Sequence, residues 1–88
     1  MDFIRGRVVL SKAGRDKGKF LAVESVDGDY VTVVDGGERP VDNPKRKNKR
    51  HLALTKTVLP GDSLSTNRGL RKALREFNSP GDAREGGN

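Results

Sequence analysis

The chain of 88 residues has no cysteine, no tryptophan, one histidine, one tyrosine and three phenylalanines. Without cysteine there is no disulfide framework, no thiolate zinc site and no cysteine nucleophile. No apolar run approaches the roughly 20 residues of a membrane span, and none has the apolar region of a secretory signal. We therefore expect a cytoplasmic protein that binds no metal, no other cofactor and no membrane.

Positive charge is abundant and unevenly distributed. The chain has 18 basic and 12 acidic residues, a net charge of +6. Residues 1–36 carry six of each sign, residues 37–56 carry seven basic against two acidic, and residues 57–88 carry five against four. Five cations lie within Lys45–Arg50. Such a run repels itself, and we favour neutralisation of nucleic-acid phosphates as its purpose. A nuclear localisation signal and a chance of composition are the alternatives.

Side chains for catalysis are few. His51 has no cysteine and no second histidine with which to share a metal. Asp27, Asp29 and Asp35 lie in turn-like segments, where Asp serves backbone geometry. Residues 14–19 superficially resemble a phosphate-binding loop, but they lack the first glycine at the required spacing, and no long helix follows. We predict that the protein is not an enzyme, and that His51 has a structural or a base-stacking role.

Short β-strands dominate the first 56 residues. Asp27-Gly28-Asp29 is a tight-turn signal that predicts a hairpin, and Gly6 indicates a bulge or a close backbone approach. The basic run Lys45–Arg50 is predicted to be a loop. Four or five short strands in so small a chain favour an open β-barrel. The predicted strands are Phe3–Leu10, Phe20–Val26, Tyr30–Val34, Glu38–Val41 (an edge strand, because of Pro40) and His51–Leu54.

The chain has so few aromatic residues that we expect them to contribute to the core rather than to the surface. We therefore place Phe3 and Phe20 in the core. Tyr30 is interpreted as a core residue of the hairpin, with a base-stacking platform as the alternative. Recognition of a nucleic acid should then depend on phosphates and shape, with weak sequence preference.

The last third of the chain has a different pattern. Leu70, Ala73, Leu74 and Phe77 fall at helical spacing, after Ser65 and Thr66, either of which can cap a helix. Two helical turns are marginal alone, so the apolar stripe should dock on the barrel or form only on binding. We divide this part into a linker and a short amphipathic helix over residues 57–78, and a disordered tail over residues 79–88.

The segment from Gly6 to Lys19, followed by Phe20–Val26, resembles the KOW motif of ribosomal proteins and transcription elongation factors. That motif is a strand, a basic glycine-containing loop and a second strand, and Gly18 matches its signature glycine. The segments Asp29–Gly36 and Lys45–Leu52 follow along the chain. The order of these segments is similar to that in large-subunit ribosomal protein L-fourteen-e of archaea and eukaryotes and in its small bacterial KOW-domain relatives. The resemblance covers roughly residues 5–55.

This resemblance implies an all-β, SH3-like open barrel of four to five short strands over residues 1–56. It also implies a non-catalytic protein that binds structured RNA, ribosomal RNA foremost, as a ribosomal or ribosome-associated component. Ribosomal or transcription proteins are further expected partners, and the free protein should be a monomer. The SH3-like barrel places both basic segments on its rim, where Gly14 and Gly18 let the backbone approach a sugar-phosphate chain or simply form turns.

The expected contacts fall into two sets of cations. The first set is Lys12, Arg15, Lys17, Lys19, Lys45, Arg46, Lys47, Lys49 and Arg50. The second, weaker set is Arg71, Lys72 and Arg75. A different hypothesis is a protein-interaction module of the transcription or translation machinery, in which the stripe Leu70, Leu74 and Phe77 seats on a partner. DNA is a weaker option, because no segment is typical of a major-groove recognition helix.

Overall fold

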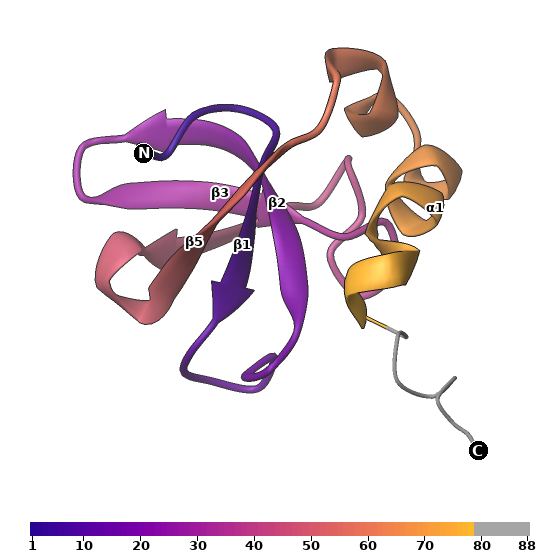
Figure 1. The fold of residues 1–88 in the computed structure, drawn as a ribbon. Helices are drawn as coiled ribbons and strands as arrows, with labels where there is room; N and C mark the ends of the chain where they lie inside the picture. Colours follow the sequence, from indigo (N-terminus) through magenta and orange to yellow (C-terminus); the bar gives the residue numbers. More distant parts are fainter. Residues whose placement is uncertain (79–88) are drawn as a thin grey trace.

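The computed structural model describes residues 1–78, which form five antiparallel strands in one open sheet and one short helix (Figure 1). The sheet order is β4-β3-β2-β1-β5, so the fifth strand returns beside the first. The strands are β1 (Arg7–Ser11), β2 (Phe20–Asp27), β3 (Tyr30–Val34), β4 (Lys45–Asn48) and β5 (Leu52–Val58). The 3₁₀ turns η1 (Lys49–His51) and η2 (Gly61–Leu64) flank β5, and helix α1 (Asn67–Asn78) follows.

The mostly β prediction and the short C-terminal helix are confirmed, while the tail predicted over residues 79–88 lies outside the described residues. The hairpin is confirmed at the predicted turn, where Asp27 pairs with Tyr30 and Gly28 has a φ of 60°. Within residues 1–78 no helix is long and apolar enough to cross a membrane.

The central strands are apolar on both faces because the sheet packs against two cores. One face of the sheet carries a cluster that includes Val9, Leu21 and Val33. The opposite face carries Val8 and Ala22, which pack under the segment that follows β5. Strands buried on both sides need near-continuous apolar runs, which β1 and the first half of β2 have.

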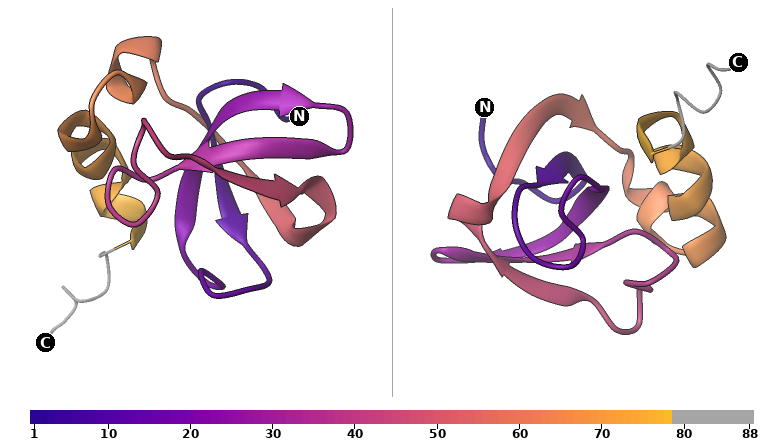
Figure 2. Two further views of the ribbon diagram at one scale, coloured as in Figure 1. Left: turned by 180° about the vertical axis from the view of Figure 1, so that it is seen from behind. Right: turned by 90° about the horizontal axis from the view of Figure 1, so that it is seen from below.

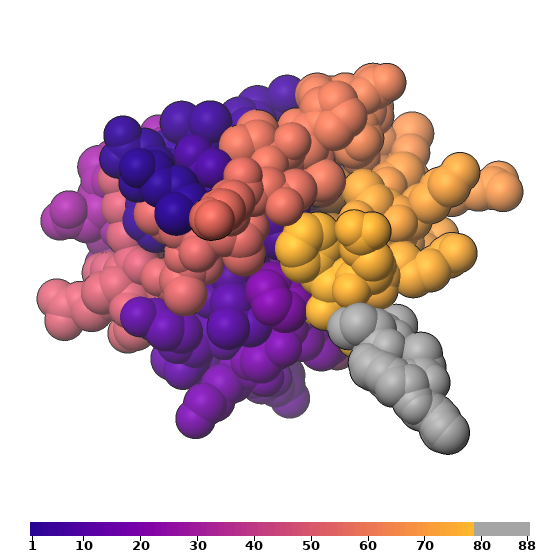
Figure 3. Space-filling model, viewed as in Figure 1, coloured from indigo at the N-terminus to yellow at the C-terminus, as the bar shows by residue number. Residues whose placement is uncertain are grey.

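Helix α1 covers the second of these faces. Leu70 and Leu74 are 0% and 1% exposed, and the ring centroids of Phe77 and Phe20 lie 5.3 Å apart. Thr66 is the cap, because its Oγ1 accepts a hydrogen bond from Gly69 N at 3.0 Å. Figure 3 shows the helix seated against the strands, with long side chains reaching outward. The stripe is therefore docked on the sheet of its own chain.

Polar contacts fix one end of α1 to strand β2 and the other end to the β3–β4 connection. The Asn78 side chain accepts from Phe20 N at 2.8 Å and donates to Phe20 O at 3.0 Å. Asn67 Oδ1 accepts from Val41 N at 2.8 Å near the other end. Buried apolar area and satisfied backbone groups together stabilise a helix too short to persist alone.

The predicted strand over residues 38–41 is wrong. The backbone there folds into a turn in which Asp35 Oδ1 accepts from Gly37 N and Arg39 N, at 2.8 and 2.9 Å. The fourth strand is instead Lys45–Asn48, where the run of like charges predicts a loop. A like-charged run is unfavourable in a central strand, but at this sheet edge Arg46 is exposed and Lys45 is half-buried, so only Lys47 among the cations of β4 is buried. The first strand begins at Arg7 rather than Phe3, and the last extends to Val58.

Gly6 provides the close approach that the sequence indicates. A Cβ atom there would lie 2.5 Å from Leu59 O. Leu59 N donates a backbone hydrogen bond to Gly6 O at 2.8 Å. The pairing of β1 with β5 is irregular nearby, with a register shift between Arg7 and Val9.

Gly36 joins the sheet to the helix, and we predict that Gly36→Ala destabilises the protein strongly. Its φ is 82°, and a Cβ atom would lie 2.3 Å from Asn67 O in the first turn of α1. The variant should lose more than about 2 kcal/mol of unfolding free energy, because the turn must shift away from the helix. Chemical denaturation measures this.

Gly28→Ala is the matched control. Gly28 also has a positive φ, of 60°, but an added Cβ meets nothing within 4 Å. The unfolding free energy of this variant should fall only by the conformational cost of about 1 kcal/mol. Equal losses in the two variants would contradict the packing role of Gly36.

Candidate nucleic-acid interface

Strand β4 places alternate residues of the basic run on opposite faces of the sheet. Lys45 and Lys47 pair with Val33 and Val31, which belong to a buried core. Arg46 and Asn48 lie on the other face, as strand alternation requires. The exposures follow this pattern, because Lys47 is buried and Arg46 is exposed.

Lys47 is the centre of a buried hydrogen-bond cluster. Its Nζ donates to Asp16 Oδ1 at 2.7 Å, to Ser11 Oγ at 2.9 Å and to Ala13 O at 2.9 Å. These three acceptors satisfy all three donors of the ammonium group. Ser11 Oγ in turn donates to Asp16 Oδ1 at 2.8 Å. Lys47 and Asp16 are 7% and 3% exposed, so this is a buried ion pair.

The ion pair controls the protonation of Asp16. Burial alone would raise the pKa of Asp16, but hydrogen bonds from Lys47 and Ser11 and the positive charge of Lys47 outweigh it. The pKa of Asp16 is therefore held below its ordinary value. Its Oδ2 is buried without a hydrogen-bond partner within residues 1–78, so compensation of the charge depends on Oδ1 and Lys47.

The lowered pKa of Asp16 predicts a loss of stability in acid. A carboxylate whose pKa is lower in the folded state stabilises that state at pH values above its unfolded pKa. This stabilisation should be fully present above about pH 4–5 and should decline as the pH falls through the folded pKa. Thermal unfolding between pH 7 and pH 2 measures it. The double variant Asp16→Asn/Lys47→Met should lose less stability over the acid range, and an unchanged pH dependence would contradict this assignment.

The cluster joins the two basic segments predicted from the sequence. Lys47 lies on β4, whereas Ser11, Ala13 and Asp16 belong to the end of β1 and the β1–β2 connection. A further backbone bond from Lys12 N to His51 O, at 2.8 Å, joins the same connection to η1. Figure 2 shows the connection lying across one end of the sheet when the molecule is viewed from below. The two segments thus lie in contact with each other.

Eight of the nine cations in the first predicted set, all within these two segments, are exposed or half-buried. Lys47 is the exception, and it must be withdrawn from the set because its ammonium group is buried and fully bonded. Gly14 and Gly18 have φ values of 87° and 90°, so both form turns that need glycine. We call the eight cations the basic surface: Lys12, Arg15, Lys17, Lys19, Lys45, Arg46, Lys49 and Arg50.

Within residues 1–78, one cation of the basic surface forms an ion pair. Lys19 Nζ lies 2.9 Å from Glu38 Oε1, and the hydrogen bond to Glu38 raises the pKa of Lys19. The bond from Lys19 likewise lowers the pKa of Glu38. Both side chains are largely exposed, so this pair contributes little to stability. Arg39 lies beside it, lining a hollow with Arg15 and Lys19, and no pattern in the sequence predicted its contribution.

Tyr30 is not a core residue, contrary to our interpretation. It is 39% exposed, and Arg46 Cζ lies 4.2 Å from the centroid of its ring. The cores are filled instead by Val31, Val33 and Val34. By strand alternation Tyr30 shares a face of β3 with the buried Val34, but it lies at the hairpin end of the strand and belongs to neither core cluster. Phe3 and Phe20, which the sequence places in the core, are half-buried and pack against the two cores without belonging to them.

The second predicted set lies on the outer side of α1. Arg71, Lys72 and Arg75 are exposed, and with Arg68 they line a hollow of about 610 Å³. Arg71 also has a structural role, because its Nη1 donates to Gly36 O at 2.6 Å. Arg71 and Arg75 share another hollow with Lys19, so the helix cations lie beside the basic surface.

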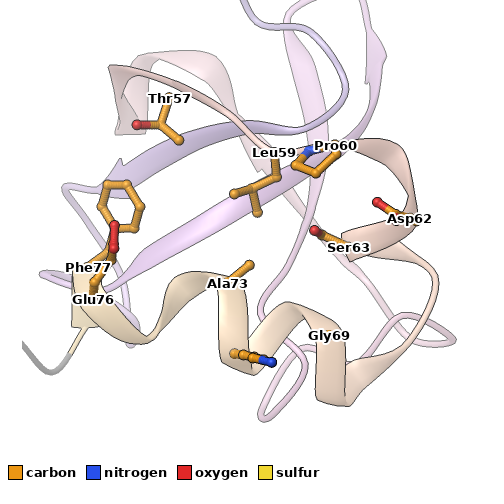
Figure 4. Close-up of a pocket in the computed structure, with 10 residues that line it drawn as sticks. Thr57, Leu59, Pro60, Asp62, Ser63, Gly69, Ala73, Glu76 and Phe77 are labelled. Atoms are coloured by element: carbon orange, nitrogen blue, oxygen red, sulfur yellow. The ribbon is translucent and has the colours of Figure 1, made fainter.

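A hollow of about 540 Å³ on another side has a different character (Figure 4). It lies between α1 and the segment from β5 to η2, with Leu59, Ala73 and Phe77 among its lining residues. Asp62 and Glu76 lie there with Lys72, so charges of both signs meet. Within residues 1–78 no three His, Cys, Asp or Glu side chains gather as metal ligands. The basic surface therefore remains the stronger candidate for a binding site.

Comparison of the chain with protein-family models and with curated proteins finds no match.

Proposed function

We propose that this protein is a non-catalytic RNA-binding protein of the KOW type. In this proposal it binds structured RNA, ribosomal RNA foremost, as a ribosomal or ribosome-associated component. The sheet order, with β5 beside β1 and a 3₁₀ turn leading into β5, supports an SH3-like barrel as the finer description of the fold. The residues that resemble the KOW motif form β1, the β1–β2 connection and β2.

The observation that carries the proposal is the junction built by Lys47. One buried ion pair holds the β1–β2 connection against β4, and the remaining cations of both segments are exposed or half-buried. A fixed array of positive charge binds phosphates without first having to order two separate loops. The net charge of +6 favours encounter with a polyanion at long range.

Phosphate contacts dominate the recognition that this surface supports. Lysines act as point charges, and Arg15 and Arg50 present planar guanidinium groups that bind phosphates in a bidentate manner. The protein-partner alternative has less support, because Leu70 and Leu74 are buried against the sheet and are not free to seat a partner.

The test is a titration of a labelled fragment of structured ribosomal RNA at several salt concentrations. Five or six phosphate contacts predict that the logarithm of the association constant falls with the logarithm of salt, with a slope of about −3 to −5. Duplex DNA of equal length should bind more weakly. No binding at low salt, or a slope near zero, would show that the basic surface is only a solvated face.

A further inference from the structure

Tyr30 and Arg46 lie at a hollow of about 380 Å³, where β3, β4 and the β1–β2 connection meet. This volume lies within the range of sites that hold a small molecule. One wall is formed by Ala13 and Gly14, which have little or no side chain. Lys45 lines the same hollow, so it adds a second positive charge to that of Arg46 there.

We propose that this hollow binds one unpaired nucleotide of an RNA, with its base stacked on the Tyr30–Arg46 pair and its phosphate close to Lys45. The inference rests on the proposed function, because it concerns the same basic surface. It adds a site for a base to a surface that otherwise contacts phosphates.

The side chains suit a base for three reasons. Aromatic rings and guanidinium planes are the two platforms on which proteins stack unpaired RNA bases. In this hollow the two lie together, with Arg46 Cζ 4.2 Å from the Tyr30 ring centroid. Tyr30 belongs to neither core cluster and is 39% exposed, so part of its ring is accessible at the surface beside Arg46.

Polar groups at the hollow can read the edge of a base. Asn48 Oδ1 accepts from Arg50 N at 2.9 Å, which leaves the Nδ2 donors without a partner within residues 1–78. His51 is exposed and lines the same hollow. The Gly14 wall is held in place through Ala13 O, which accepts from the buried Lys47. The wall formed by Ala13 and Gly14 is thus preorganised, whereas the side formed by Asn48 and His51 is adaptable.

The composition of the chain allows a direct test, because Tyr30 is the only tyrosine and there is no tryptophan. Intrinsic fluorescence excited in the tyrosine band therefore reports on this site alone. The probes are an RNA hairpin with one bulged nucleotide, the same hairpin fully paired, and inorganic polyphosphate as an anion without bases. The bulged hairpin should quench Tyr30 and bind about tenfold more tightly than the paired one. Polyphosphate should bind with little quenching.

Two variants separate stacking from charge, with affinity followed through a label on the RNA. Tyr30→Phe should keep the preference for the bulged hairpin, whereas Tyr30→Ala should lose it and bind both hairpins about equally. Because Tyr30 is partly exposed, neither change should unfold the protein. If Tyr30→Ala keeps the preference, or if RNA binds with a steep salt dependence but without quenching, the nucleotide site is wrong and the proposed function stands. If neither hairpin binds at low salt, both proposals fail.

Discussion

Lys47→Met should lower the free energy of unfolding by about 3–5 kcal/mol, because it leaves the Asp16 carboxylate buried without its cation. Methionine keeps much of the length of lysine, so the loss reports on the charge and its three hydrogen bonds rather than on a large cavity. For a domain of this size the midpoint of thermal unfolding should fall by about 12 °C or more. Urea denaturation of the full chain, together with thermal unfolding, measures the effect.

Lys45→Met is the matched control. Lys45 lies two residues away on the same face of β4, is half-buried, and forms no ion pair within residues 1–78. Its replacement should change the unfolding free energy by less than about 0.5 kcal/mol. The double variant Asp16→Asn/Lys47→Met should recover part of the loss, because no buried charge then remains uncompensated. A Lys47→Met protein as stable as the Lys45→Met protein would show that the ion pair does not hold the two segments together.

Neutralising the basic surface should have the largest effect on RNA binding. The fourfold variant Arg15→Gln/Lys17→Gln/Arg46→Gln/Arg50→Gln removes four exposed cations while leaving the buried cluster intact. Each lost phosphate contact reduces affinity by about sixfold near 0.1 M salt, so about a thousandfold is expected in all. The salt slope should also become shallower by about 3. Equilibrium titration at three salt concentrations measures both quantities.

The control for this variant removes exposed cations elsewhere. Arg5 and Lys56 are exposed and lie outside the basic surface. Arg5→Gln/Lys56→Gln should reduce affinity by no more than about threefold, through the change in net charge alone. If this pair weakened binding as much per charge as the fourfold variant does, the attraction would be general and the basic surface would not be the site.

Much of the fold could be predicted from local patterns. The Asp27-Gly28-Asp29 signal predicts the β2–β3 hairpin, and the apolar spacing of Leu70, Leu74 and Phe77 predicts the docked face of α1. These features depend on neighbouring residues, so the sequence contains the information they need. The helix docks through Gly36 and Asn67, and that contact between distant segments had no local signal.

The outline of the candidate site could be predicted from the sequence, but the prediction was wrong in two details. A run of five cations in six residues indicates a loop by every local rule, yet it begins as an edge strand because Asp16, 31 residues earlier, neutralises Lys47. This compensation is a tertiary contact that no window of the sequence reveals. The interpretation of Tyr30 as a core residue is also wrong. Tyr30 shares a face of β3 with the buried Val34, but it lies at the hairpin end of the strand and is 39% exposed. How far along β3 the core extends is a tertiary feature without a local signal.

The most direct test of the basic surface is to map the RNA-binding face on the intact protein by ¹H–¹⁵N NMR during titration with a structured ribosomal RNA fragment. We predict that the largest shift changes fall on the amides of residues 12–19 and 45–51, with smaller changes on the outer side of α1. Both sets of shift changes should become smaller as the salt concentration is raised. Changes centred on the hollow between α1 and the β5–η2 segment, with residues 12–19 and 45–51 unmoved, would contradict the assignment of the basic surface.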